Sequence, residues 1–107
     1  MMNHVALPEK TQQLLANAPL TGQDADEKIR FMLENEYLRR LGQCRRADLL
    51  LTHKYGMTFD EFVSRRITRE KGYSWESESD AMKWETIVSS MKDMEDHLRK
   101  LRKHSYV

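Results

Sequence analysis

Apolar residues recur at intervals of three and four through the last third of the chain. This spacing places them on one face of an α-helix, in the rhythm typical of coiled coils. The predicted helix has its cap at Ser77 or Ser79 and ends near Lys103. Its apolar face, here called the seam, comprises Trp84, Ile87, Met91, Met94, Leu98 and Leu101. Such a face is stable only when another helix covers it, from the same chain or from a partner.

A second long helix is predicted between Asp24 and Gly56. Asp24 is a good N-terminal cap with Glu27 following it, and Gly56 suits the left-handed residue that ends many helices. The apolar positions are Ile29, Leu33, Tyr37, Leu41, Cys44, Leu51 and Tyr55, and Asp48 interrupts them. About 31 residues would extend about 46 Å, so this helix either projects from the domain or bends at Gly42.

The segment between the long helices carries the strongest local start signal. Thr58 and Glu61 fit a capping box, and a helix is predicted over residues 59 to about 70, ended by Gly72. We expect it to bury Phe59, Phe62, Val63 and Ile67. The alternation that marks strands is absent from the sequence. We therefore predict an all-α fold, an elongated helical hairpin or bundle with two long antiparallel helices joined by a short capped helix.

The start of the chain has a different character. Residues 1–22 are predicted to form an N-terminal arm, with a short helix from Glu9 to Ala16 that Pro19 and Gly22 terminate. A mobile terminus is the alternative interpretation of this arm. Residues 23–107 are predicted to form a single helical domain.

Charges along both long helices are arranged in blocks. Residues 24–36 hold five acidic and two basic residues, whereas residues 39–54 hold five basic and one acidic. Residues 76–85 hold four acidic residues and one lysine, and residues 99–103 contribute four positive charges. Two antiparallel helices of this kind place acid beside base at both ends, whereas parallel helices place like charges together. The blocks therefore favour antiparallel packing, within the chain or across a two-fold axis.

The overall composition excludes several classes of protein. A net charge of +1 argues against a dedicated nucleic-acid binder, and the single Cys44 excludes an intrachain disulfide or a cysteine zinc cluster. With 39% apolar and 33% charged residues, the core is expected to be thin. The longest apolar run, residues 49–51, is too short to span a bilayer, and no leader opens the chain, so we expect a cytoplasmic protein without a membrane partner.

Candidates for chemistry are few. Asp93 and His97 share a helix face, but two ligands make a weak metal site. Cys44 falls on the apolar face, where a cysteine is usually inert packing. The glycines are isolated, so the sequence has no phosphate-binding loop. We therefore predict no enzyme, catalytic residue, metal, cofactor or small-molecule ligand.

A DNA-binding regulator is one alternative. Residues 47–71 have the outline of a helix-turn-helix, in which Arg65, Arg66 and Arg69 would lie on the second helix. Asp60 and Glu61 at the start of that helix would repel phosphates. A homo-oligomeric helical scaffold, joined through the seam, is a further alternative.

Residues 54–62 read Lys-Tyr-Gly-Met-Thr-Phe-Asp-Glu-Phe and are followed by an acidic loop, Asp80, Trp84, Glu85 and Glu95. This pattern, over residues 54–101, resembles small helical antitoxin-like proteins of prokaryotic type II toxin–antitoxin modules. The resemblance implies a non-enzymatic protein that neutralises a toxin by wrapping it, and that also represses its own operon. No ribbon-helix-helix or homeodomain-like segment is recognisable near the N-terminus. We expect a protein partner, a toxin or a second copy, bound through the six residues of the seam.

Overall fold

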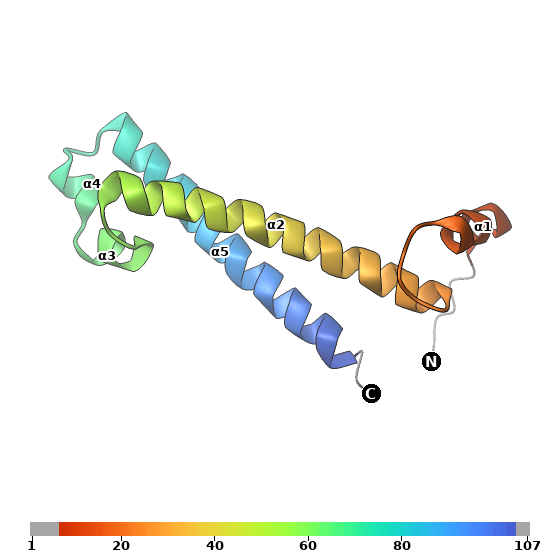
Figure 1. Cartoon of the computed structure of the whole chain (residues 1–107). Helices are drawn as coiled ribbons and strands as arrows, with labels where there is room; N and C mark the ends of the chain where they lie inside the picture. Colours follow the sequence, from red (N-terminus) through yellow and green to blue (C-terminus); the bar gives the residue numbers. More distant parts are fainter. Residues whose placement is uncertain (1–6, 105–107) are drawn as a thin grey trace. The chain divides into compact units, whose positions relative to one another are not determined.

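A computed structural model describes residues 7–104 of the chain, and no strand occurs among them. The helices are α1 (Glu9–Asn17), α2 (Ala25–Tyr55), α3 (Phe59–Ser64), α4 (Ile67–Glu70) and α5 (Trp75–His104) (Figure 1). The predicted helical class and the two long helices are therefore confirmed. The chain divides into two compact units, one ending at Glu36 and the other beginning at Tyr37, so α2 contributes to both.

The first unit contains α1 and the start of α2. Its α1 begins at the predicted residue and ends one residue later than predicted. Nζ of Lys28 donates hydrogen bonds to the carbonyl oxygens of Leu15 and Ala16, at 3.1 and 3.2 Å, and so satisfies carbonyls at the end of α1. The backbone N–H of Glu27 donates to Oδ1 of Asp24 at 2.9 Å, as expected of an N-terminal cap. The predicted division after residue 22 lies inside this unit, and residues 1–6 and 105–107 lie outside the described residues.

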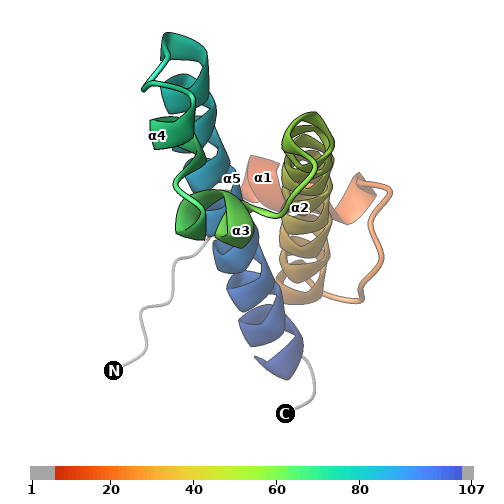
Figure 2. The ribbon, with the colours of Figure 1, turned by 90° about the vertical axis from the view of Figure 1, so that its left-hand side faces the viewer.

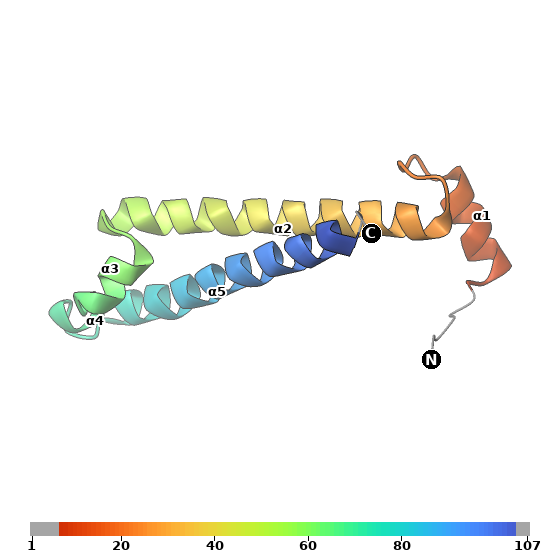
Figure 3. The ribbon, with the colours of Figure 1, turned by 90° about the horizontal axis from the view of Figure 1, so that it is seen from below.

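In the second unit, α5 lies beside the later part of α2 (Figure 3). Lys54 of α2 contacts Asp80 of α5, and Tyr37 of α2 contacts His97 of α5. Between these contacts α2 continues through Gly42 as one helix.

The short connection differs from the prediction of a single helix over residues 59–70. Arg66 adopts a left-handed conformation, with φ 52° and ψ 48°, which separates α3 from α4. Residues five positions apart on a continuous helix lie about 140° apart around its axis. Phe62 and Ile67 could not both face the core on one helix, yet they are only 2% and 4% exposed here. Burial of both side chains therefore accounts for the break, whereas Val63, predicted to be buried, is 56% exposed.

The start of α5 is also earlier than predicted. The hydroxyl oxygen of Ser74 accepts a hydrogen bond from the backbone N–H of Ser77 at 3.2 Å, so Ser74 is the cap. The predicted caps Ser77 and Ser79 lie inside the first turns of α5. Figure 2 shows α4 beside the start of α5, and Phe62 of α3 packs against Trp84 further along the helix.

The core of the second unit forms around Trp84, whose side chain is completely buried. Its ring lies 5.2 Å from that of Phe62 and 5.5 Å from that of Phe59, measured between ring centroids. The indole Nε1 donates a hydrogen bond to Oδ1 of Asp48 at 2.8 Å, so the one polar group of this side chain is satisfied. Asp48 interrupts the apolar face of α2, and its carboxylate is the hydrogen-bond acceptor for the buried indole of Trp84.

Candidate protein-interaction site

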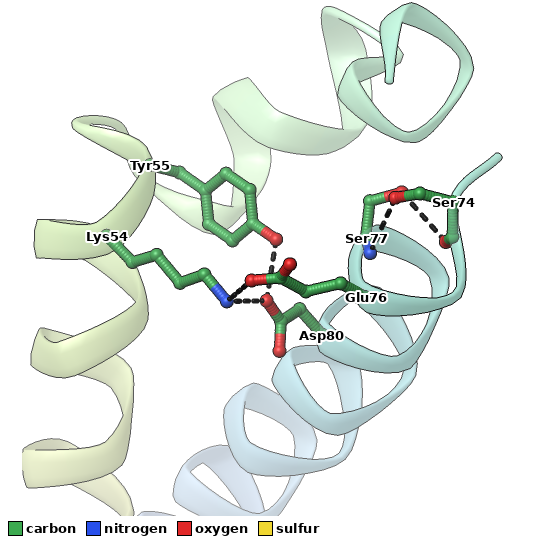
Figure 4. Close-up of polar contacts among 6 residues, drawn as sticks. All are labelled: Lys54, Tyr55, Ser74, Glu76, Ser77 and Asp80. Carbon is green, nitrogen blue, oxygen red and sulfur yellow. Dashed lines mark hydrogen bonds and ion pairs between the residues drawn. The ribbon is translucent and has the colours of Figure 1, made fainter. Parts of the chain in front are cut away.

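A polar cluster fixes the end of α2 to the first turns of α5 (Figure 4). Nζ of Lys54 lies 2.6 Å from Oδ2 of Asp80 and 2.6 Å from Oε1 of Glu76. The hydroxyl of Tyr55 donates a hydrogen bond of 2.6 Å to the same Oδ2 of Asp80. At this end of the pair, the basic block of α2 therefore lies beside the acidic block of α5.

The pKa values of Asp80, Lys54 and Tyr55 in this cluster are displaced from their ordinary values. Burial acts to raise the pKa of Asp80, but hydrogen bonds from Lys54 and Tyr55 outweigh it and lower that pKa below its ordinary value. Hydrogen bonds to Asp80 and Glu76 raise the pKa of Lys54 above its ordinary 10.5. Burial, together with the hydrogen bond to Asp80, raises the pKa of Tyr55 to about 12. The cluster therefore joins α2 to α5 through one carboxylate, Asp80, that accepts hydrogen bonds from both Lys54 and Tyr55.

The seam of α5 consists of a part beside the core cluster and a later part nearer the end of the helix. Trp84 is completely buried, and Ile87, itself half-buried, packs against the core cluster, so the first part is partly covered by the same chain. Further along, Leu98 is 4% exposed, whereas Met91 and Met94 are half-buried. Leu101 is half-buried as well. The later part of the seam thus retains accessible apolar surface.

A groove of about 470 Å³ lies beside this later part, between α2 and α5. It is lined by Leu38, Leu41, Arg45, Glu95, Leu98, Arg99 and Arg102, and we call it the basic groove. Leu41 and Leu98 are 3% and 4% exposed, so they form its floor, whereas Leu38 on α2 is 42% exposed. An apolar floor with an exposed leucine beside it suits the apolar side chains of a partner.

Positive charge predominates around the groove. Nη2 of Arg45 lies 3.7 Å from Oε2 of Glu95, an ion pair too long for a hydrogen bond. Nη1 of Arg99 lies 3.0 Å from Oδ1 of Asp96 on the same helix, and its side chain is 74% exposed. Exposed pairs of this kind contribute about 0–1 kcal/mol, so a partner carboxylate can compete for these arginines.

The arginines of the predicted helix-turn-helix do not lie on one helix. Arg65 follows α3 as its C-terminal cap, Arg66 occupies the left-handed break, and Arg69 belongs to α4. All three are exposed. Since α3 ends at Ser64, a second helix carrying all three arginines is not formed, and that part of the prediction is wrong.

The other candidates for chemistry are separated. Cys44 is half-buried, and the imidazole of His97 stacks on the ring of Tyr37 with centroids 5.3 Å apart. Asp93 is exposed on the same helix as His97. Among residues 7–104, no three His, Cys, Asp or Glu side chains gather where they could hold a metal ion.

The sequence pattern predicted Leu98 of α5 and Leu41 of α2 to lie on apolar faces but did not single out Leu38 and Arg45 of α2. Leu38, Leu41 and Arg45 follow one another at intervals of three and four, which is the signal that could have found them.

Across the described part of the chain, no helix has the length and apolar character needed to cross a bilayer. Comparisons of the chain with protein-family models, curated proteins and solved structures found no match.

Proposed function

We propose that this chain is a non-enzymatic protein-interaction subunit that binds a helix of a protein partner in the basic groove. The observation that carries the proposal is the groove itself, with its buried leucine floor and three arginines between α2 and α5. By the resemblance of residues 54–101, the partner is a toxin that the chain neutralises in the cytoplasm.

The pair of long helices supports this function. In the proposed arrangement, α2 and α5 form an antiparallel hairpin whose apolar surface is incompletely covered, and a third helix completes the packing. Met91 and Met94 are half-buried beside the groove on α5. Methionine side chains adapt their shape to a partner, which suits a surface that is covered only on binding.

The charges indicate the chemistry of the partner. Three arginines and one glutamate line the groove, so a helix with apolar residues at intervals of three and four and acidic flanks would complement it. Positive charge around the groove would also speed the encounter with an acidic partner, and would do so less at high salt.

A heterologous partner is favoured over a second copy of the chain. A two-fold contact through the groove would set the same surface of both copies against itself. The three arginines of one groove would then approach those of the other, and the single glutamate of each groove, Glu95, offsets only part of that positive charge. The charges of the groove therefore disfavour self-association through this surface.

Co-expression tests the proposal directly. The full chain is produced together with the product of the adjacent reading frame and purified through a tag on the chain. Leu38→Glu places a carboxylate in the groove, whereas Leu50→Glu places one at a position on α2 that is 73% exposed and does not line the groove. We expect Leu38→Glu to abolish co-purification and Leu50→Glu to preserve it, with both variants retaining wild-type helicity by circular dichroism.

Two outcomes would contradict the proposal. One is co-purification that Leu38→Glu leaves unchanged. The other is a dimer of the free chain, measured by light scattering, that Leu38→Glu converts to a monomer, because the groove would then serve self-association.

A further inference from the structure

A second hollow, of about 400 Å³, lies where α3, α4 and the start of α5 meet, and it shares no residue with the basic groove. Phe62, Val63 and Ala81 form its apolar lining. Phe62 is 2% exposed and Val63 56% exposed, so the lining extends from the core to the surface. The volume falls within the range of about 300–1,000 Å³ that small-molecule sites occupy.

Two guanidinium groups give this hollow its charge. Arg66 and Arg69 line it, and no carboxylate does. Within residues 7–104, neither arginine forms an ion pair with a carboxylate. A guanidinium presents a planar fork of donors that matches the two oxygens of a carboxylate or phosphate. The hollow, here called the arginine pocket, therefore combines unpaired positive charge with apolar surface.

The backbone around the pocket is unusual in the same place. Arg66 and Tyr73 are the two non-glycine residues with positive φ in the described part of the chain, at 52° and 54°. Both line the arginine pocket. A left-handed conformation is costly for residues with a Cβ, and glycine would adopt it freely. Side chains at two such positions, facing one pocket, are consistent with a role for those side chains.

We propose that the arginine pocket binds a small oxyanion, a carboxylate or a phosphate monoester, that carries an apolar body. Arg66 and Arg69 hold the oxyanion, while Phe62, Val63 and Ala81 contact the body. This departs from the sequence-based expectation of no small-molecule ligand. The site is separate from the basic groove, so each can fail its test without affecting the other.

Titration of the full, isotope-labelled chain, followed by amide NMR signals, tests the pocket. The probes are 4-phenylbutyrate and phenyl phosphate, with 4-phenylbutanamide as a neutral analogue of the carboxylate. We expect at least one anion to shift the signals of Arg66, Arg69 and Tyr73, and the amide to bind at least about tenfold more weakly. The anion that binds with the higher affinity identifies the preferred oxyanion, carboxylate or phosphate. Equal binding of the amide, or no shift with either anion, would overturn the proposal.

Arg66→Gly provides a second test, because a loss of binding in this variant could not be attributed to unfolding. Arg66→Gly removes one guanidinium and suits the left-handed backbone, so the fold should be retained or stabilised. We expect affinity for the anion to fall about tenfold or more. Arg65→Ala removes the neighbouring charge, which does not line the pocket, and should preserve binding to within about twofold. Wild-type affinity in Arg66→Gly, or an equal loss in Arg65→Ala, would overturn the assignment.

Discussion

The indole of Trp84 on α5 donates its hydrogen bond to the carboxylate of Asp48 on α2, with 2.8 Å between Nε1 and Oδ1. Trp84 is completely buried, so the donor cannot turn to water. The bond therefore fixes α2 and α5 at one position along their length, because any sliding of α5 leaves a buried N–H without a partner.

Replacement of Asp48 by alanine should destabilise the protein through that orphaned donor. We expect the free energy of unfolding to fall by about 1–3 kcal/mol in Asp48→Ala, and by less in Asp48→Asn, which keeps an acceptor oxygen. Urea denaturation measures both. Asp93→Ala, an exposed acid on α5, is the matched control and should change stability by less than about 0.5 kcal/mol. An equal loss in Asp48→Ala and Asp93→Ala would mean that the bond contributes nothing specific.

The polar cluster links stability to pH in both directions. The pKa of Asp80 is lower in the folded protein, so its stabilising contribution is complete above its ordinary 3.8 and disappears as pH falls through the folded value. The pKa values of Lys54 and Tyr55 are raised, so their contributions are complete below their ordinary 10.5 and 10.0 and disappear as pH rises. We expect a plateau in the free energy of unfolding between about pH 5 and 9, with losses on both sides.

Asp80→Asn isolates this cluster from the other titrating groups. The variant should lose about 1–3 kcal/mol at neutral pH, since it removes a charged acceptor that is only 8% exposed. Because the variant lacks this titrating carboxylate, its free energy of unfolding should fall less than that of the wild type as the pH is lowered. Glu78→Gln, an exposed change two residues from Asp80 and outside the polar cluster, should leave the pH profile of chemical denaturation as in the wild type. If Asp80→Asn lost as much stability at low pH as the wild type, the link between Asp80 and the pH dependence would be contradicted.

Local signals in the sequence were enough to predict much of the architecture. The cap at Asp24 and the glycine at position 56 mark the start and end of α2 closely, because both act through the backbone beside them. The left-handed break at Arg66 was missed, because it depends on burial of Ile67 against a distant part of the chain. Tertiary burial here overrides the local helical pattern.

Only part of the candidate site could be predicted, namely Leu41 on α2 and Leu98 on α5. Periodicity found the seam, but the basic groove depends on the register between α2 and α5, which the spacing of apolar residues does not determine. Asp48 illustrates the difficulty, since it breaks the apolar pattern of α2 and yet fixes that register through Trp84. The predicted pairing of acid with base is observed where Lys54 meets Glu76 and Asp80. The other acidic block, residues 24–36, belongs to the first unit, so its pairing stays a prediction.

The cap of α5 gives a simple test of its observed start. Ser74→Ala removes the oxygen that accepts from the N–H of Ser77, and we expect a loss of about 1 kcal/mol in the free energy of unfolding. Ser79→Ala, at a predicted cap that lies inside α5, should cost less than about 0.5 kcal/mol. Thermal denaturation of the two variants under identical conditions compares them. A larger loss in Ser79→Ala would place the start of the helix where the sequence suggested.

The two adjacent arginines at the break between α3 and α4 should respond oppositely to glycine. Arg66 has φ 52°, where a side chain strains the backbone, so Arg66→Gly should raise the free energy of unfolding by about 0.5–1 kcal/mol. Arg65 has φ −85° and ψ −2°, which any residue adopts, so Arg65→Gly should lower it by about 0.5–1 kcal/mol through the added freedom of the unfolded chain. Both variants remove one positive charge, so their difference in urea denaturation isolates the backbone. An equal loss of stability in the two variants would show that the left-handed conformation of Arg66 is not strained.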